Sequence, residues 1–178
     1  LENIFNGTSL GPSDISIDRY NNVWVSLFDS EAIVKFDSDL NFILSAVPSK
    51  DYSLIIEPQS IEEEYILNED FTFLQGEDPL EESVELHPPI IETDKQSNVW
   101  VCYPSDNVST LYKFNTNGQT LLRAGQLPQT SYPVSLAIDA YNRVWVACKN
   151  TNQVLCFSTE GILVSSINDL IFPSYIAL

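Results

Sequence analysis

The sequence predicts an all-β chain made of repeated four-stranded antiparallel sheets, and three observations predict it. The stretch DRYNNVWVS returns twice, as DKQSNVWVC and as DAYNRVWVA. Each copy has a Pro six residues before its Asp and a Trp six residues after it. Each copy is also followed by short apolar runs that are separated by turn-forming residues, which is the pattern of strands joined by tight turns.

Four apolar runs in each copy predict four strands. The first copy has them as ISID at 15–18, VWVSLF at 23–28, AIVKF at 32–36 and FILSA at 42–46. Val, Ile, Trp and Phe are favoured in strands. The polar groups between the runs, such as RYNN and DSDLN, are turn-forming chemistry. The other two copies repeat the same order of strands and turns.

Three residue types recur at fixed places: an Asp closing the first strand, a Trp in the second and a Phe closing the third. We expect each Asp to accept hydrogen bonds from the amides of the turn that follows, rather than to line a channel mouth as an active-site group. We expect each Trp to lie between sheets, because Val on both sides of it indicates a strand buried on both faces. These repeat residues are Asp18, Trp24, Phe36, Asp94, Trp100, Phe114, Asp139, Trp145 and Phe157.

The length of the repeat indicates the architecture. Pro88 and Pro133 are 45 residues apart, and Pro133 and Pro173 are 40 apart. Four strands per unit of this length are typical of β-propeller blades. We therefore predict a β-propeller segment that belongs to a larger ring, with three recognisable blades and the start of a fourth. The predicted units are the end of a preceding blade at 1–11, blades at 12–46, 87–131 and 132–172, and the next blade from 173–178.

The segment 47–86 interrupts this spacing and has two interpretations. It carries twelve acidic residues and one Lys. It is either an acidic insertion or a degenerate blade, since the 76 residues from Pro12 to Pro88 are twice 38. Loss of the Asp-to-Trp spacing favours the insertion. Its candidate partner surface consists of Glu62, Glu63, Glu64, Glu69 and Asp70.

The net charge and the cysteine content limit which partners and sites this chain is expected to have. The net charge of −17 disfavours nucleic acid and anionic membranes as partners, and it favours basic or cation-bearing partners. No apolar run is long enough for a membrane-spanning helix. The absence of Met is typical of a processed or partial chain. We expect all three cysteines, Cys102, Cys148 and Cys156, to be buried reduced thiols, because they lie in apolar strand-like runs and lack metal-binding spacing.

Catalytic, cofactor-binding and metal-binding residues are not predicted. The run EEE at 62–64 reads as a solvated face rather than a calcium site. DSDLN begins like a calcium loop, but Phe42 stands where Gly is required and Pro48 where Glu is required. The one histidine, His87, is expected to be structural or exposed. Tyr20, Tyr103 and Tyr141 lie at predicted loops and are candidates for surface recognition.

The pattern P-x-x-I-x-x-D-x-x-x-N-V-W-V followed by x-K-F-D resembles NHL-type propeller repeats. It is also similar to blades of virginiamycin B lyase-like and gluconolactonase-like propellers, over residues 12–46, 87–125 and 132–178. The lyase resemblance implies a catalytic His with acidic, metal-binding neighbours, and the lactonase resemblance implies one divalent cation held by Glu, Asn and Asp. Neither set can be placed here residue by residue. The Trp-containing blades with Asn-rich turns also resemble those of virion and tail proteins of tailed bacteriophages.

These observations predict a non-catalytic propeller module with a structural or interaction role in a larger assembly, such as a phage virion or tail. Its partners would be other protein chains or missing blades of the same protein. The alternative is a propeller enzyme of the lyase or lactonase type, whose metal-binding and catalytic residues lie in blades outside this sequence. An NHL-type RNA binder conflicts with the net charge of −17.

Overall fold

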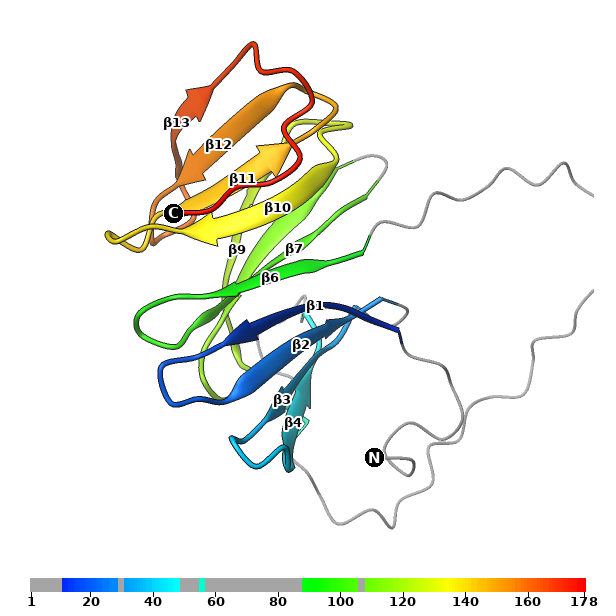
Figure 1. Ribbon diagram of the computed structural model, residues 1–178, viewed down its shortest axis with the longest axis vertical. Helices are drawn as coiled ribbons and strands as arrows, with labels where there is room; N and C mark the ends of the chain where they lie inside the picture. Colours follow the sequence, from blue (N-terminus) through cyan, green and yellow to red (C-terminus); the bar gives the residue numbers. More distant parts are fainter. Residues whose placement is uncertain (1–10, 29–30, 49–54, 57–87, 106–107) are drawn as a thin grey trace, which may run out of the picture.

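A computed structural model describes residues 11–28, 31–48, 55–56, 88–105 and 108–178. It confirms the predicted fold class, since these residues form three antiparallel sheets in which the strands follow chain order from one edge to the other (Figure 1). The described part of the chain holds no helix capable of crossing a membrane.

Each sheet is one blade of four strands, and the first blade carries a short fifth strand at its edge. Blade 1 consists of β1 (Pro12–Ile17), β2 (Val23–Leu27), β3 (Ile33–Phe36) and β4 (Phe42–Ala46), with β5 (Ile55–Ile56) paired to β4. Blade 2 consists of β6 (Ile90–Thr93), β7 (Val99–Tyr103), β8 (Thr110–Phe114) and β9 (Thr120–Gln126). Blade 3 consists of β10 (Pro133–Ile138), β11 (Val144–Cys148), β12 (Gln153–Phe157) and β13 (Leu163–Ile167).

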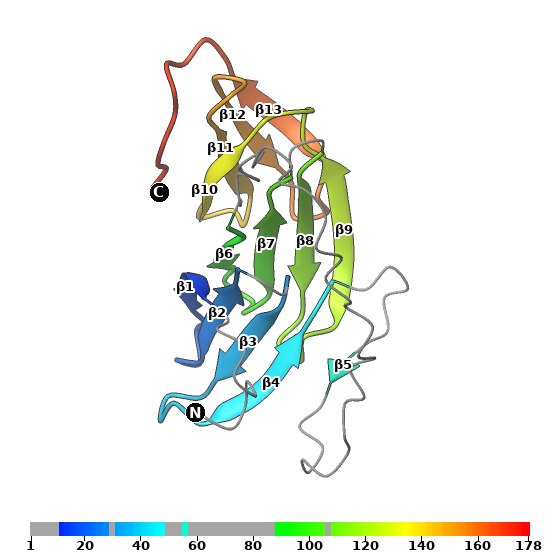
Figure 2. The ribbon, with the colours of Figure 1, turned by 90° about the vertical axis from the view of Figure 1, so that its right-hand side faces the viewer.

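The innermost strands β1, β6 and β10 lie next to one another, and the outermost strands β4 and β9 lie along the opposite side (Figure 2). The turns that join the first and second strands of the blades all lie at one edge of the molecule, on the left of Figure 1. We call this the turn edge. Loops at the other edge differ between blades in sequence and length. The blades therefore repeat the same residues at the turn edge and differ from one another at the opposite edge.

The two larger hydrophobic clusters lie between the blades, and a smaller third cluster, of Leu27, Ala32 and Val34, lies within blade 1. One cluster joins Trp24 and Ile33 of blade 1 to Val99 and Phe114 of blade 2. A second cluster joins blade 2 to blade 3 through Trp100, Leu111, Val144 and Phe157. Each fully buried apolar side chain of this size contributes roughly 1.5–3 kcal/mol. A single blade has nothing to bury its faces against, so these seams between blades hold the fold together.

Blades 1 and 2 are therefore direct neighbours in the stack, although the acidic segment separates them in the sequence. Most of that segment, including the candidate partner surface, lies outside the described residues. The choice between an insertion and a degenerate blade at 47–86 consequently stays a prediction. Strands β1–β4 run from Pro12 to Ala46 and strands β10–β13 from Pro133 to Ile167, and the blade boundaries at 12–46 and 132–172 stay predictions.

The turn between the third and fourth strands of each blade contains one residue in the left-handed backbone region. These residues are Leu40 (φ 64°), Gly118 (φ 75°) and Gly161 (φ 71°). A Cβ on Gly118 would lie 2.9 Å from the Cβ of Ala46, and a Cβ on Gly161 would lie 2.6 Å from that of Ala124. Both glycines are thus needed for the turn to rest on the fourth strand of the preceding blade. Leu40, at the same place in blade 1, is exposed.

Candidate functional site

The turn between β1 and β2 is organised by the carboxylate of Asp18. Its Oδ1 accepts hydrogen bonds from the backbone amides of Tyr20 and Asn22, at 2.9 and 3.0 Å. Its Oδ2 accepts hydrogen bonds from the Asn22 side chain at 2.9 Å and from the Trp24 indole Nε1 at 3.2 Å. One buried carboxylate thus fixes both the turn and the indole ring, which accounts for the six-residue spacing between Asp and Trp.

Blade 2 repeats this arrangement with one change. Asp94 accepts hydrogen bonds from the amides of Gln96 and Asn98, both at 2.9 Å. Its Oδ2 also pairs with the ammonium of Lys113 at 3.5 Å. The indole Nε1 of Trp100 is buried and has no hydrogen-bond partner among the residues described. Lys113 therefore takes the place that the indole has beside Asp18.

Blade 3 retains the indole bond and adds a cation. Asp139 accepts hydrogen bonds from the amides of Tyr141 and Arg143, and from Trp145 Nε1 at 3.1 Å. The Arg143 Nε donates to Asp139 Oδ2 at 2.6 Å. Burial opposes the charged form of Asp139, but the hydrogen bonds from Trp145 and Arg143 favour it more strongly and lower its pKa from 3.8 to about 2. The carboxylate is therefore committed to holding the turn.

In each of the two seams between blades, a lysine of one blade contacts the next blade, and we call this arrangement the lysine clamp. Lys35 on β3 lies opposite Trp24 on β2, and its Nζ is 4.9 Å from the centre of the indole ring. The same Nζ donates to the backbone oxygen of Thr116 in blade 2 at 2.9 Å. Burial lowers the pKa of Lys35, and the charge of Asp18 acts against this shift. The clamp thus joins a cation–π contact to a hydrogen bond between blades.

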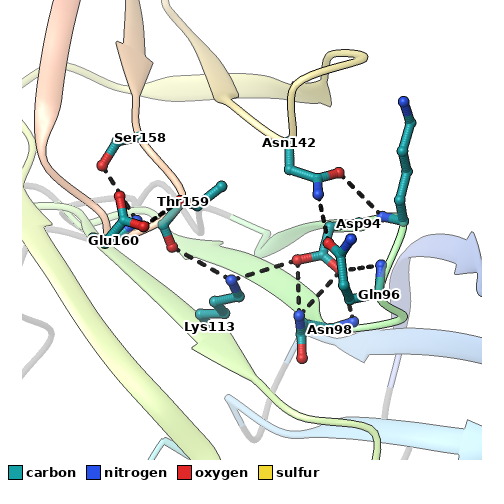
Figure 3. Close-up of polar contacts among 9 residues, drawn as sticks. Asp94, Gln96, Asn98, Lys113, Asn142, Ser158, Thr159 and Glu160 are labelled. Atoms are coloured by element: carbon teal, nitrogen blue, oxygen red, sulfur yellow. Dashed lines mark hydrogen bonds and ion pairs between the residues drawn. The ribbon is translucent and has the colours of Figure 1, made fainter.

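The second clamp has the same geometry one blade further on. Lys113 Nζ lies 4.9 Å from the centre of the Trp100 ring. It also donates to the backbone oxygen of Thr159 at 3.3 Å (Figure 3). In blade 3 the position opposite Trp145 is Cys156, and the cation comes instead from Arg143, whose guanidinium carbon lies 5.4 Å from the Trp145 ring. The outer face of blade 3 therefore has a cation stacked on its Trp, but it has no lysine that joins this contact to a hydrogen bond with another blade.

The turns of successive blades also contact one another at the turn edge. Arg19 Nη1 donates to the backbone oxygen of Lys95 at 3.4 Å, and Lys95 Nζ donates to that of Ala140 at 2.6 Å. These three residues occupy the same repeat position, directly after the Asp. Asn142 accepts a hydrogen bond from the Lys95 amide and donates one to Gln96 Oε1 (Figure 3). A chain of contacts thus links the turns from blade to blade.

The predicted turn at DSDLN has the same physical basis. Asp37 accepts hydrogen bonds from the amides of Asp39 and Asn41, at 2.9 and 2.8 Å. Asn115 and Ser158 do the same at the equivalent places in blades 2 and 3. These side-chain acceptors are occupied by their own turns, as in other Asx and Ser/Thr turns.

Along the seam between β1 and β6, side chains of β1 accept hydrogen bonds from the main chain of β6. The amide of Ile91 donates to Asp14 Oδ2 at 2.9 Å, and that of Thr93 donates to Ser16 Oγ at 3.0 Å. These strands are therefore held by side-chain contacts and not by a ladder of main-chain bonds. Glu92 accepts a hydrogen bond from Ser16 Oγ at 3.1 Å, and burial raises its pKa.

Of the tyrosines predicted to be surface recognition residues, two are exposed and one is not. Tyr20 and Tyr141 are exposed, and each has a guanidinium carbon, of Arg19 and Arg143, at 5.0 and 5.5 Å from its ring. Tyr103 was wrong as a surface candidate, because its hydroxyl is buried in the seam facing blade 1. The acidic residues Glu62, Glu63, Glu64, Glu69 and Asp70 lie outside the described residues, as does His87.

All three cysteines are free and buried. Cys102 and Cys148 belong to the cluster between blades 2 and 3. Burial raises the pKa of Cys148 to about 12 and also raises those of Cys102 and Cys156. The thiols are therefore protonated at neutral pH and pack as small apolar groups.

Comparison of the three-bladed stack with solved structures finds propellers. A streptogramin B lyase matches with a TM-score of 0.60 and 13% identity, over 90% of this chain and 41% of the lyase. The fold is that of a virginiamycin B lyase-like β-propeller. A catalytically inactive virginiamycin B lyase variant from Staphylococcus aureus, with quinupristin, matches with a TM-score of 0.61 and 13% identity, over 95% of this chain and 46% of that one.

A protein of unknown function from Bacteroides caccae has the same fold, with a TM-score of 0.55 and 10% identity over 96% of this chain and 50% of that one. This chain thus spans half or less of the length of these three propellers. No family model matches it, and no curated protein matches it in sequence. At such low identity the likeness establishes the fold and not an activity.

Replacing Ser97 by Asn should stabilise the protein. Ser97 and Asn142 occupy the same turn position, with φ of 65° and 61°, but the buried hydroxyl of Ser97 has no partner within the described ranges. Asn tolerates this backbone region better and has the reach to bind the preceding turn, as Asn142 does. We expect the free energy of unfolding to rise by about 1 kcal/mol in denaturant titrations. Ser97→Ala is the control, and an Asn variant no more stable than the Ala variant would refute the equivalence of the two turns.

Replacing Asp139 by Asn should destabilise the protein in a pH-dependent way. The folded pKa of Asp139 lies below its unfolded value of 3.8, so its stabilisation is present above 3.8 and is lost as pH falls through about 2. We expect Asp139→Asn to cost about 2 kcal/mol at pH 7, because it removes a charged acceptor. Thermal unfolding should show the difference between the two proteins shrinking below pH 4. A difference that is constant from pH 7 to pH 2 would show that the charge is irrelevant.

Proposed function

We propose that this chain is a non-catalytic propeller module that joins a larger assembly by packing its terminal blade faces against further protein. One comparison carries this proposal. Ile15, Ile91 and Leu136 occupy the same repeat position, three residues after the Pro of each blade. Ile91 and Leu136 face a preceding blade and are 2% and 7% exposed, whereas Ile15 is 60% exposed. The same position is buried wherever a neighbouring blade is present.

Other residues on this face of blade 1 support the same conclusion. Ile17 is 61% exposed and Leu40 is 63% exposed. Phe36 is half-buried, while Phe114 and Phe157 at the same repeat position are fully or almost fully buried. Leu27 and Val34 on the same face are buried in the cluster within blade 1, so the uncovered part is formed by Ile15, Ile17 and Leu40. An exposed apolar patch of this kind is typical of a protein-binding site.

The chemistry of the described side chains supports binding over catalysis. The carboxylates of the repeat hold their own turns, and the cysteines are protonated and buried. Lys35 and Lys113 bridge neighbouring blades. Groups with these structural commitments are poorly placed to act as acids, bases or nucleophiles, which need access to a substrate.

The net charge of −17 favours a partner with basic surface. The candidate partner surface in the acidic segment, and the context of a phage virion or tail, stay predictions that rest on the sequence. The partners we propose are protein chains or further blades, with neither nucleic acid nor membrane involved.

The alternative function is that of a propeller enzyme, and the similarity to two lyase structures is the observation that favours it. In that case the metal-binding and catalytic residues of the lyase or lactonase type would be supplied by blades outside residues 1–178. The two functions differ in whether the propeller that those further blades would complete turns over a substrate.

Substitution at Ile15 should leave stability unchanged, whereas the same change at Ile91 should not. We expect Ile15→Ser to alter the free energy of unfolding by less than about 0.5 kcal/mol, since the side chain is exposed. We expect Ile91→Ser, at the matched position inside a seam, to cost about 3 kcal/mol. Denaturant titration measures both. Equal costs would mean that the face of blade 1 is already covered, and the proposal would fail.

Quinupristin should remain unchanged when incubated with this chain and a divalent cation such as Mg²⁺, as followed by liquid chromatography and mass spectrometry. The physical reason is that the recurrent carboxylates already serve as acceptors for their own turns. Turnover that disappears on addition of a chelator would overturn the non-catalytic assignment, and it would mean that metal-binding and catalytic residues lie within residues 1–178.

A further inference from the structure

The two residues that follow the Asp of each blade are exposed in all three blades, at the turn edge on the left of Figure 1. Blade 2 has a neighbouring blade on each side, and its Lys95 and Gln96 are exposed all the same. Stacking of blades therefore leaves these positions uncovered, whatever lies beyond either end of the stack. We call these residues, together with Arg143, the tip row: Arg19, Tyr20, Lys95, Gln96, Ala140, Tyr141 and Arg143.

The opposite charges of each turn lie at different depths. Asp18 and Asp94 are 3% and 4% exposed, and their carboxylates accept hydrogen bonds from their own turns. Arg19 and Lys95, which directly follow them in the sequence, are exposed. A ligand that approaches the turn edge of blades 1 and 2 therefore meets the cations and not the carboxylates.

In blade 3 the cation comes from a different position of the turn. Ala140 follows the Asp, and Arg143 lies over Tyr141 with its guanidinium carbon 5.5 Å from the centre of the ring. In blade 1, Arg19 lies over Tyr20 in the same way, at 5.0 Å. Each of the three blades thus contributes one Arg or Lys to the tip row, and two blades add a tyrosine.

These cations retain hydrogen-bond donors for a ligand. Arg19 uses Nη1 for a contact with the next turn, Arg143 uses Nε for Asp139, and Lys95 donates to one backbone oxygen. A guanidinium has five N–H donors and an ammonium has three, so donors remain on all three side chains. The contacts between turns, including that of Asn142 with Gln96 (Figure 3), hold the row in one arrangement. A surface ordered in advance lowers the entropic cost of binding.

The distribution of negative charge is compatible with an acidic ligand on this row. Twelve acidic residues and one Lys leave eleven of the 17 net negative charges in the segment 47–86 and six in the rest of the chain. On the turn edge itself, Asp39 and Glu160 are exposed, but they belong to the turns between the third and fourth strands, nearer the outside of each blade. An acidic ligand is therefore attracted along the tip row and repelled from the outer turns.

We propose that the tip row binds an acidic, extended segment of a partner protein. Tyr and Arg are the residue types that contribute most to binding at protein–protein interfaces, and Arg and Lys form charge-assisted hydrogen bonds with carboxylates. This inference goes beyond the proposed function, since it concerns the turn edge and not the faces of the blades. It holds whether further blades or other chains cover those faces.

The spacing of the blades sets the spacing of the acidic residues in the ligand. Packed sheets lie about 10 Å apart. A polyproline II helix has three residues per turn and rises about 3.1 Å per residue, so every third side chain lies on one face at intervals of about 9 Å. A ligand in this conformation with Glu at every third position presents one carboxylate to each of Arg19, Lys95 and Arg143. Tyr20 and Tyr141 supply the aromatic contacts by which such helices are commonly recognised.

The first experiment compares two dye-labelled peptides of identical composition by fluorescence anisotropy, with the full chain as titrant. One peptide repeats Glu-Pro-Ala three times, and the other places its three Glu residues consecutively at one end. We expect the spaced peptide to bind about fivefold more tightly, and its affinity to fall as salt is added. Equal affinities, or no binding of either peptide, would overturn the proposal.

The second experiment compares Lys95→Gln with the matched variant Arg123→Gln. Each removes one positive charge from an exposed side chain, but Arg123 is on the outermost strand β9, with its guanidinium carbon 6.0 Å from the centre of the Tyr112 ring. We expect Lys95→Gln to weaken binding of the spaced peptide about fivefold and Arg123→Gln to leave it unchanged. Tyr20→Ala, at a side chain that is 61% exposed, is a second variant expected to weaken binding. Equal effects of the two charge changes would show that the peptide senses only net charge, and the proposal would fail.

The third experiment tests the class of ligand with polygalacturonate, an acidic polysaccharide, as competitor for the labelled spaced peptide. We expect displacement only when its carboxylates are well in excess of those of unlabelled peptide that give the same displacement. Displacement at a lower carboxylate concentration than the unlabelled peptide requires would assign the tip row to an acidic glycan and overturn the peptide assignment.

Discussion

The fold depends on the carboxylate that closes the first strand of each blade. Asp18 and Asp139 each bind two turn amides, one side chain of the turn and the indole of the Trp six residues later. The carboxylate thereby supplies acceptors for the amides of the turn, and it binds the indole that projects out of the same sheet. Local turn geometry and packing between blades are thus set by the same charged group.

The sequence reveals the parts of this arrangement that reside in side-chain identity. Asp and Trp recur six residues apart because the carboxylate binds the amides of the turn between them, and the four-stranded architecture follows from that repeat. The lysine clamp is partly visible as x-K-F in blades 1 and 2. Its acceptors are the backbone oxygens of Thr116 and Thr159, which any residue could supply, so the sequence carries no sign of them. The contact between Lys95 and Ala140 is hidden for the same reason.

Deviations from the repeat were harder to interpret from the sequence than the repeat itself. Cys156 was expected to be a buried thiol. Its position opposite Trp145 shows that it stands where blades 1 and 2 have the lysine of the clamp. Tyr103 was misjudged because it ends a strand, where a loop was expected, and its ring packs in the seam. Leu40 shows that a turn tolerates a side chain at the Gly position where no described blade packs beneath it.

Every Trp of the repeat projects from its own blade toward the blade that follows, and none projects backwards. One end of the stack consequently presents an indole with a cation above it, and the other presents isoleucines. The molecule therefore has a polarity, with a head and a tail that differ in chemistry. A blade added at either end of such a stack must keep the same orientation, so a ring built from it has a fixed hand.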